Sequence, residues 1–178
     1  MDGVNLQREQ ILAVLEAIGS GATSAGVVLV CGGTSAVIEG WRQGTVDIDL
    51  GYLTEPGNFF QTLSTIISSK DVSVDMVTPA SFVPTLPGAA SRHELIARYG
   101  QVEFRHFDFY TQALAKLQRG RARDMADVLA MIEAGKITPH QLLNHFVEVE
   151  GELIRYPAVD ADRLRHLVEQ LDRDKRGG

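Results

Sequence analysis

Residues 27–50 read VVLVCGGTSAVIEGWRQGTVDIDL, and this stretch decides the fold. Its first five residues are apolar and mostly β-branched without polar alternation, which predicts a strand covered on both faces in the middle of a sheet. Two glycines end this run, and residues 34–39 leave room only for a short helix, which Gly40 closes. A strand, a glycine turn and a short helix therefore lead into the aspartates that follow.

At residues 46–50 apolar side chains alternate with Asp47 and Asp49, which is the period of a half-buried strand. The two carboxylates therefore project from one face, about 7 Å apart along the strand. Asp75 lies in a later expected strand at residues 72–77 and joins them if that strand pairs beside the first. Three clustered carboxylates repel one another without cations, and carboxylate oxygens suit Mg²⁺. The pattern predicts a two-metal site at Asp47, Asp49 and Asp75 for two Mg²⁺ ions, with Mn²⁺ as an alternative.

The glycine turn is a candidate phosphate site. Gly32 and Gly33 let backbone N–H groups approach an anion, the following helix start favours negative charge, and the hydroxyls of Thr34 and Ser35 add hydrogen-bond donors. The turn has neither the GxGxxG pattern nor a Walker lysine, so its interpretation depends on the aspartates after it.

The rest of the chain indicates an α+β fold, with a mixed sheet of four or five strands flanked by helices and followed by a helical C-terminal region. A boundary near Phe107 separates an α/β head at 1–107 from a helical region at 108–178, which is expected to pack on the head and complete the site. The Pro-rich residues 79–88 are expected to form a surface loop, and residues 172–178 a frayed end. Helices are expected at 6–18, 59–67, 109–117, 124–132, 139–154 and 162–171, and further strands at 95–98 and 102–106.

A second group of charged residues lies in the helical region. Lys116, Arg119, Arg121 and Arg123 concentrate positive charge in a chain whose net charge is −6, and cations of this kind bind phosphates. Asp127 follows Arg123 by four residues, a spacing at which its carboxylate can hold the guanidinium. The alternative interpretation is a solvated helix face, on which the acidic residues only cap and pair.

The segment GGTSAVIEGWRQGTVDIDL resembles the first motif of the nucleotidyltransferase superfamily related to DNA polymerase β, in which a Gly-Gly or Gly-Ser turn precedes an Asp-x-Asp strand. Arg42 and Thr45 before the aspartates resemble the AbiEii-like group, which includes toxins of toxin–antitoxin pairs. In that superfamily a third carboxylate comes from a later strand, which Asp75 matches. Many relatives have serine where this chain has Gly33.

The segment ALAKLQRGRARDMADVLAMI is similar to the group's second conserved region. In that region a lysine on one helix and an Arg-Asp pair with a further Asp on the next helix complete the nucleotide site. The matching positions are Lys116, Arg123, Asp124 and Asp127. The resemblance implies catalytic roles for Lys116 and the three metal carboxylates, and nucleotide-binding roles for Gly32, Gly33, Thr34, Ser35, Arg42, Thr45, Arg123, Asp124 and Asp127.

The resemblance implies a Mg²⁺-dependent nucleotidyltransferase, which moves a nucleoside monophosphate from an NTP such as ATP to an acceptor hydroxyl. A toxin likeness points to tRNA as the acceptor and to a cognate antitoxin as a partner. Two alternatives remain open: a catalytically silent module that binds a nucleotide or a partner, and transfer to a protein or to a small molecule of the aminoglycoside type.

The composition of the chain limits its partners and its cellular compartment. The acidic balance argues against non-specific binding to nucleic acid, and so against a DNA duplex as partner. Cys31 is the one cysteine, which excludes an internal disulfide and fits a reducing compartment. No apolar run reaches the roughly 20 residues of a membrane span, so we expect a cytoplasmic protein without a membrane partner.

Overall fold

The structure is a computed structural model that describes residues 5–177, and these form two units. Unit 1 takes the residues up to Thr78 together with His93–Phe107, and unit 2 takes Pro79–Arg92 together with the residues from Asp108 onward. Residues 79–92, which the sequence led us to place in the head, thus belong to the helical unit. The packing of the helical region on the head stays a prediction.

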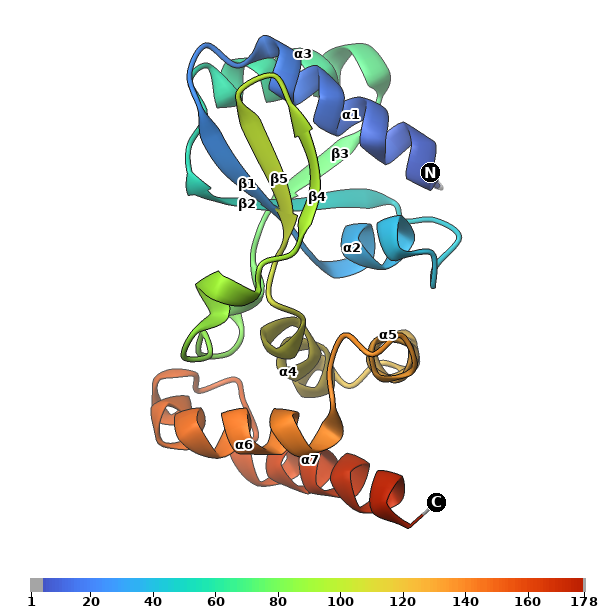
Figure 1. Cartoon of the computed structure of the whole chain (residues 1–178), viewed down its shortest axis with the longest axis vertical. Helices are drawn as coiled ribbons and strands as arrows, with labels where there is room; N and C mark the ends of the chain where they lie inside the picture. Colours follow the sequence, from blue (N-terminus) through green and yellow to red (C-terminus); the bar gives the residue numbers. More distant parts are fainter. Residues whose placement is uncertain (1–4, 178) are drawn as a thin grey trace. The chain divides into compact units, whose positions relative to one another are not determined.

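Unit 1 is built on one mixed sheet, whose strands run in the order β3-β2-β1-β5-β4 among the described residues. β1 is antiparallel to β2 and parallel to β5, β2 is parallel to β3, and β4 forms an antiparallel hairpin with β5. The α+β class and the central place of the first strand are therefore confirmed (Figure 1). The strands are β1 Gly26–Val30, β2 Asp47–Thr54, β3 Ser73–Met76, β4 Leu95–Tyr99 and β5 Val102–His106.

Three helices, α1 Arg8–Gly21, α2 Gly32–Glu39 and α3 Phe59–Lys70, belong to unit 1. Apolar residues of all three pack with residues of β1, β2 and β5 in one core. α1 begins two residues later than its apolar pattern suggested, because the backbone of Leu6 exchanges hydrogen bonds of 2.7 and 3.0 Å with Thr45. This bridge ties the chain before α1 to the residues just before the aspartates of β2.

The Pro-rich segment differs from the expected surface loop. It contains two 3-10 turns, η1 Pro79–Ser81 and η2 Ala89–Arg92, and the side chains of Val83 and Leu86 between them are buried. Proline excludes long helices and central strands but allows short turns, so apolar residues in such a segment can still pack in a core.

Unit 2 is helical, with α4 Phe109–Arg119, α5 Ala122–Glu133, α6 Pro139–Val149, the 3-10 turn η3 Glu150–Arg155 and α7 Ala161–Arg176. Thr138 caps α6, since its hydroxyl accepts a hydrogen bond from the amide of Gln141 at 3.3 Å. The prediction of a frayed end at residues 172–178 is wrong for residues 172–176. α7 continues to Arg176, because Asp172 is buried and pairs with Arg176 at 2.8 Å.

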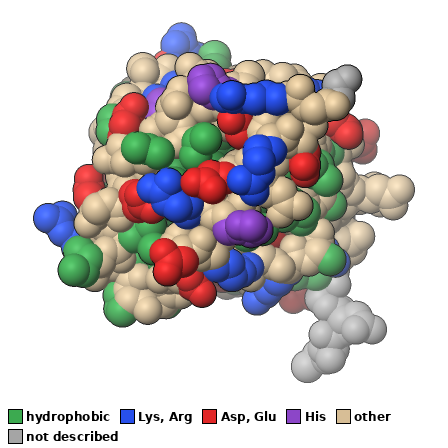
Figure 2. Space-filling view, turned by 90° about the horizontal axis from the view of Figure 1, so that it is seen from below, with side chains coloured by type: hydrophobic (Ala, Val, Ile, Leu, Met, Phe, Trp, Pro, Cys, Tyr) green, Lys and Arg blue, Asp and Glu red, His purple; other side chains and the backbone are tan. Residues whose placement is uncertain are grey.

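Acidic and basic side chains alternate over the face that Figure 2 shows. Several ion pairs lie on α7, among them Arg165 with Glu150 at 2.6 Å and with Glu169 at 3.2 Å. A surface of mixed sign does not attract a polyanion strongly. None of the helices between residues 5 and 177 combines the length and apolar character that a membrane crossing requires.

Asp108 joins the segment 79–92 to α4 within unit 2. Its buried carboxylate caps α4 and accepts hydrogen bonds from the Thr111 amide at 3.2 Å and the Thr111 hydroxyl at 2.7 Å. Arg92 adds a two-pronged contact, Nε to Oδ1 at 2.8 Å and Nη2 to Oδ2 at 3.1 Å. Five donors therefore converge on one carboxylate when the 3.4 Å bond from the Tyr110 amide is included.

Burial by itself raises the pKa of Asp108, but the hydrogen bonds from Arg92 and Thr111 outweigh it, so the pKa is lowered overall. The stability that the carboxylate contributes is therefore full above the ordinary Asp pKa of about 3.9 and is lost as the pH falls through the lowered folded-state value. We expect Asp108→Asn to lower the free energy of unfolding by about 2 kcal/mol at pH 7. The difference from wild type should shrink below about pH 4 in urea titrations. Asp174→Asn, at an exposed position of α7, is the control; an unchanged gap at low pH would contradict the assignment.

Candidate functional site

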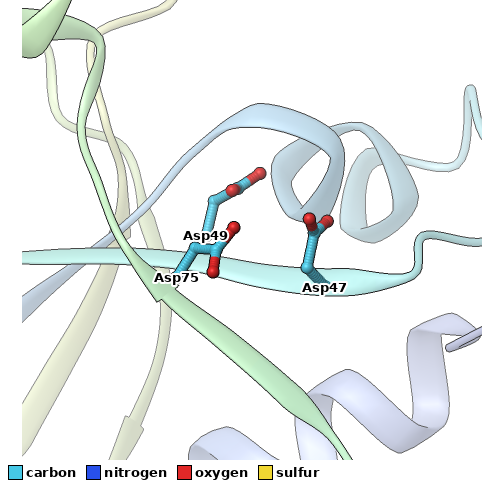
Figure 3. A group of neighbouring side chains, drawn as sticks. All are labelled: Asp47, Asp49 and Asp75. Carbon is cyan, nitrogen blue, oxygen red and sulfur yellow. The ribbon is translucent and has the colours of Figure 1, made fainter. Parts of the chain in front are cut away.

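Asp47, Asp49 and Asp75 lie together on unit 1. β3 runs beside β2, and the register places Asp75 directly opposite Asp49. Carboxylate oxygens of all three residues lie within 4.8 Å of one another, with Asp47 and Asp49 half-buried and Asp75 exposed. Figure 3 shows Asp49 and Asp75 side by side and Asp47 farther along β2, with all three carboxylates on the same side of the strands. The strand pairing on which the predicted cluster depended is therefore present.

The donor set of this cluster is made of carboxylate oxygens. Three negative charges at such spacing repel one another, and a divalent cation between them removes the repulsion. Mg²⁺ and Mn²⁺ take oxygen ligands and bind through a few carboxylates, leaving other positions for water or phosphate. The residues present therefore fit a hard divalent cation.

The first turn of α2 holds Asp49 in place. The amide of Gly33 donates a hydrogen bond of 3.1 Å to Asp49 Oδ2, and the amide of Asp49 donates one of 2.9 Å to the Thr34 hydroxyl. The amide of Cys31 adds a bond of 3.2 Å to the carbonyl of Asp49. The helix begins at Gly32, not after the glycine pair as expected, so both glycines belong to this first turn.

Gly32 brings the backbone against the Asp49 carboxylate. Its φ is +60°, and a Cβ built on it would lie 2.1 Å from Asp49 Oδ2. No side chain fits at that distance, and L-residues rarely adopt that φ. The glycine at residue 32 is therefore required by the site.

We expect Gly32→Ala to weaken divalent-cation binding at least about tenfold, as loss of groups that orient a ligand does. Gly40→Ala is the matched control, because Gly40 ends the same helix with φ +88° and has open space where a Cβ would go. Both variants should lose about 1–2 kcal/mol from backbone strain. Calorimetry with Mg²⁺ separates them; equal affinities would show that the approach of Gly32 to Asp49 does not matter for binding.

The hydroxyls of Thr34 and Ser35 point into unit 1. Both side chains are fully buried; Thr34 Oγ1 lies 3.4 Å from the Asp47 carbonyl, and Ser35 Oγ donates to the Val30 carbonyl at 3.0 Å. Their part in holding phosphate stays a prediction, and the geometry favours backbone groups of the first turn over these hydroxyls.

Arg42 and Thr45 lie beside Gly33. A Cβ on Gly33 would lie 2.7 Å from the Thr45 hydroxyl and 3.0 Å from Arg42 Nη1, and the Thr45 hydroxyl donates to Asp47 Oδ1 at 3.3 Å. The hydroxyl of Thr45 thus stands where the side chain of a serine at residue 33 would go. This accounts physically for glycine at a position where many proteins of the resembled superfamily have serine.

The predicted residues of the helical region form two ion pairs between α4 and α5 in unit 2. Lys116 Nζ lies 2.5 Å from Asp127 Oδ2, with both side chains buried, and Arg119 lies 2.5 Å from Asp124. The expected pairing of Arg123 with Asp127 is wrong, because Asp127 faces Lys116 across the helix pair and Arg123 is exposed. Their contribution to the nucleotide site stays a prediction.

Two residues that contact each other beside α2 were not among the site residues predicted from the sequence. His106 and Glu39 are bonded to each other, with His106 Nε2 2.8 Å from Glu39 Oε1. The period of β5 puts His106 on the same face as Val102 and Phe104, which places it in the interior. That alternation was the available signal in the sequence; it indicates that His106 is buried but does not identify the residues that it contacts.

Comparison with protein-family models shows that residues 9–175 match the family described as nucleotidyltransferase of unknown function (DUF6036). No curated protein and no solved structure gives a significant match to the chain. The match covers both units, and the finer resemblance to the AbiEii-like group stays a prediction.

Proposed function

Because the chain belongs to this family of nucleotidyltransferases, we propose that unit 1 transfers a nucleoside monophosphate from an NTP to an acceptor hydroxyl with the help of Mg²⁺. One observation carries the proposal: carboxylate oxygens of Asp47, Asp49 and Asp75 lie within 4.8 Å of one another. Such a cluster is costly without a cation, and the family description names a chemistry that uses cations and phosphates together.

In this proposal Asp47 and Asp49 hold the metal, and Asp75 completes the set from the neighbouring strand. Bound Mg²⁺ would supply charge stabilisation for the reacting phosphate and lower the pKa of the attacking hydroxyl. The acceptor oxygen bonds to the α-phosphorus, the bond from that phosphorus to the bridging oxygen breaks, and pyrophosphate leaves. The exposed carboxylate of Asp75 takes the proton of the acceptor hydroxyl.

The first turn of α2 supports the proposed phosphate site. Backbone N–H groups at a helix start attract anions, and this helix start lies beside the carboxylate of Asp49. Arg42 Nη1 lies near Gly33, where a guanidinium can add charge-assisted hydrogen bonds to a phosphate. The triphosphate would therefore lie over Gly33, next to the metal carboxylates.

The proposal is tested by incubating the full chain with each α-labelled NTP and Mg²⁺, in separate mixtures with tRNA, total protein and small hydroxyl compounds of the aminoglycoside type. Metal-dependent label in one acceptor fraction, with release of pyrophosphate, is the expected result. Binding of an NTP in calorimetry without product in any mixture would favour a silent binding module. Neither binding nor product would refute both ideas.

A further inference from the structure

A buried chain of hydrogen bonds connects α2 to the end of β5. His106 Nδ1 lies 2.9 Å from Ser35 Oγ, and His106 Nε2 lies 2.8 Å from Glu39 Oε1. Ser35 is fully buried, His106 is 2% exposed, and the Glu39 side chain is 20% exposed. We name this set the Ser35–His106–Glu39 chain.

The positions of Ser35 and Glu39 give this chain its mechanical effect. They lie four residues apart, on one face of α2, so a single imidazole contacts the first half of the helix and its last residue together. Ser35 Oγ also lies 3.0 Å from the carbonyl oxygen of Val30, the last residue of β1. The orientation of α2 is therefore tied to two neighbouring strands, β1 and β5.

Counting protons shows that the contacts are compatible. If the Ser35 hydroxyl donates to Val30, Nδ1 must donate to Ser35 and Nε2 to Glu39, so the ring is an imidazolium opposite a carboxylate. If the hydroxyl donates to Nδ1 instead, the neutral ring carries its proton on Nε2. In both arrangements Nε2–H is directed at Glu39, so both ring nitrogens hold α2.

The first turn of α2, at the end of the helix away from Glu39, contacts Asp49. The Gly33 amide reaches Asp49 Oδ2 at 3.1 Å, and the Cα of Gly32 lies so close to that carboxylate that a Cβ would collide with it. A small tilt of α2 would change both contacts. We propose that His106 is a positioning residue, which holds α2 through Ser35 and Glu39 so that its first turn keeps Asp49 and the phosphate-binding amides in register. This inference rests on the proposed function of Asp49.

The test compares four variants of the full chain. His106→Asn and Glu39→Ala break the chain, whereas Glu39→Gln keeps a carbonyl acceptor for Nε2–H under either proton arrangement. Leu63→Ala, in the core of unit 1 on α3, lowers stability without touching the three residues. Thermal unfolding of each variant is measured first, and all later measurements are made below the lowest unfolding temperature.

Deuterium exchange measures how readily the backbone amides of α2 open to solvent, and it does not depend on activity. Exchange over residues 32–40 should quicken about tenfold in His106→Asn and Glu39→Ala, and less than about twofold in Glu39→Gln and Leu63→Ala. In active preparations, His106→Asn and Glu39→Ala should raise KM for the NTP about tenfold, with kcat changed less.

The outcomes separate the two proposals. Exchange and KM in His106→Asn and Glu39→Ala that match Leu63→Ala would overturn the positioning role, as would faster exchange with unchanged KM. Should wild type transfer no nucleotide while α2 exchange still rises in the two broken variants, the hold of His106 on α2 would stand and the proposed function would fail. If His106→Asn does not fold, the Glu39→Ala and Glu39→Gln pair decides alone.

Discussion

Asp49→Asn is expected to reduce Mg²⁺-dependent nucleotidyl transfer at least about 100-fold, the loss typical of removing one preorganised electrostatic group. The amide keeps the shape of the side chain and one acceptor oxygen for the Gly33 amide, so the fold should change little. The lost charge is the part that a cation requires. The expected result is therefore a folded protein with weak Mg²⁺ binding and residual transfer, measured by calorimetry and by label incorporation from NTPs.

Asp71→Asn is the matched control for this change. Asp71 is an exposed carboxylate of the same unit at the C-terminal end of α3, and its backbone has φ +53°, a conformation that asparagine adopts readily. It should leave transfer and Mg²⁺ affinity unchanged. Undiminished transfer by Asp49→Asn, in a preparation where Asp71→Asn is also active, would show that the carboxylate cluster is not the reaction centre.

Lys116→Met is expected to destabilise the protein by about 3–5 kcal/mol, because it leaves the carboxylate of Asp127 buried without the charge it faces. Each of these residues is only 2% exposed, and Nζ lies 2.5 Å from Oδ2. Lys70→Met makes the same chemical change at an exposed position of α3 and should cost little. Urea titration followed by circular dichroism measures both.

The double variant Lys116→Met with Asp127→Leu should recover most of the lost stability, since replacing a whole buried ion pair by apolar residues is often close to neutral. This variant also isolates the catalytic role that the family resemblance implies for Lys116. If it is stable but transfers nucleotide as well as wild type, Lys116 acts only in packing α4 against α5. A double variant no more stable than Lys116→Met alone would contradict the account of the pair.

The central strand and the paired aspartates could be predicted because each depends on local pattern. An uninterrupted β-branched run indicates a strand with two covered faces, and a period of two puts Asp47 and Asp49 on one side of the chain whatever the tertiary structure. The same reasoning predicted strands at the places of β4 and β5. It needed no knowledge of what packs where.

Long-range pairing could not be predicted in this way. Asp75 faces Asp49 because the register of β3 on β2 puts them opposite, and that register depends on the course of the chain through α3, which connects the two strands. The direction of the Thr34 and Ser35 hydroxyls depends similarly on what surrounds α2. Sequence spacing favoured Arg123 for Asp127, whereas the packing of α4 on α5 brings Lys116 to it.

The outermost place of β3 in the sheet affects how tightly a cation can bind. β3 is four residues long, paired along one side by β2, and mostly exposed, which are the features of a strand that opens locally at small free-energy cost. A cation that needs Asp75 binds only molecules in which β3 is closed, so its apparent affinity is the intrinsic affinity multiplied by the closed fraction. By the same linkage, a cation held by Asp75 would favour the closed strand. The occupancy of the cation site and the order of β3 would then depend on the same equilibrium between the open and the closed strand.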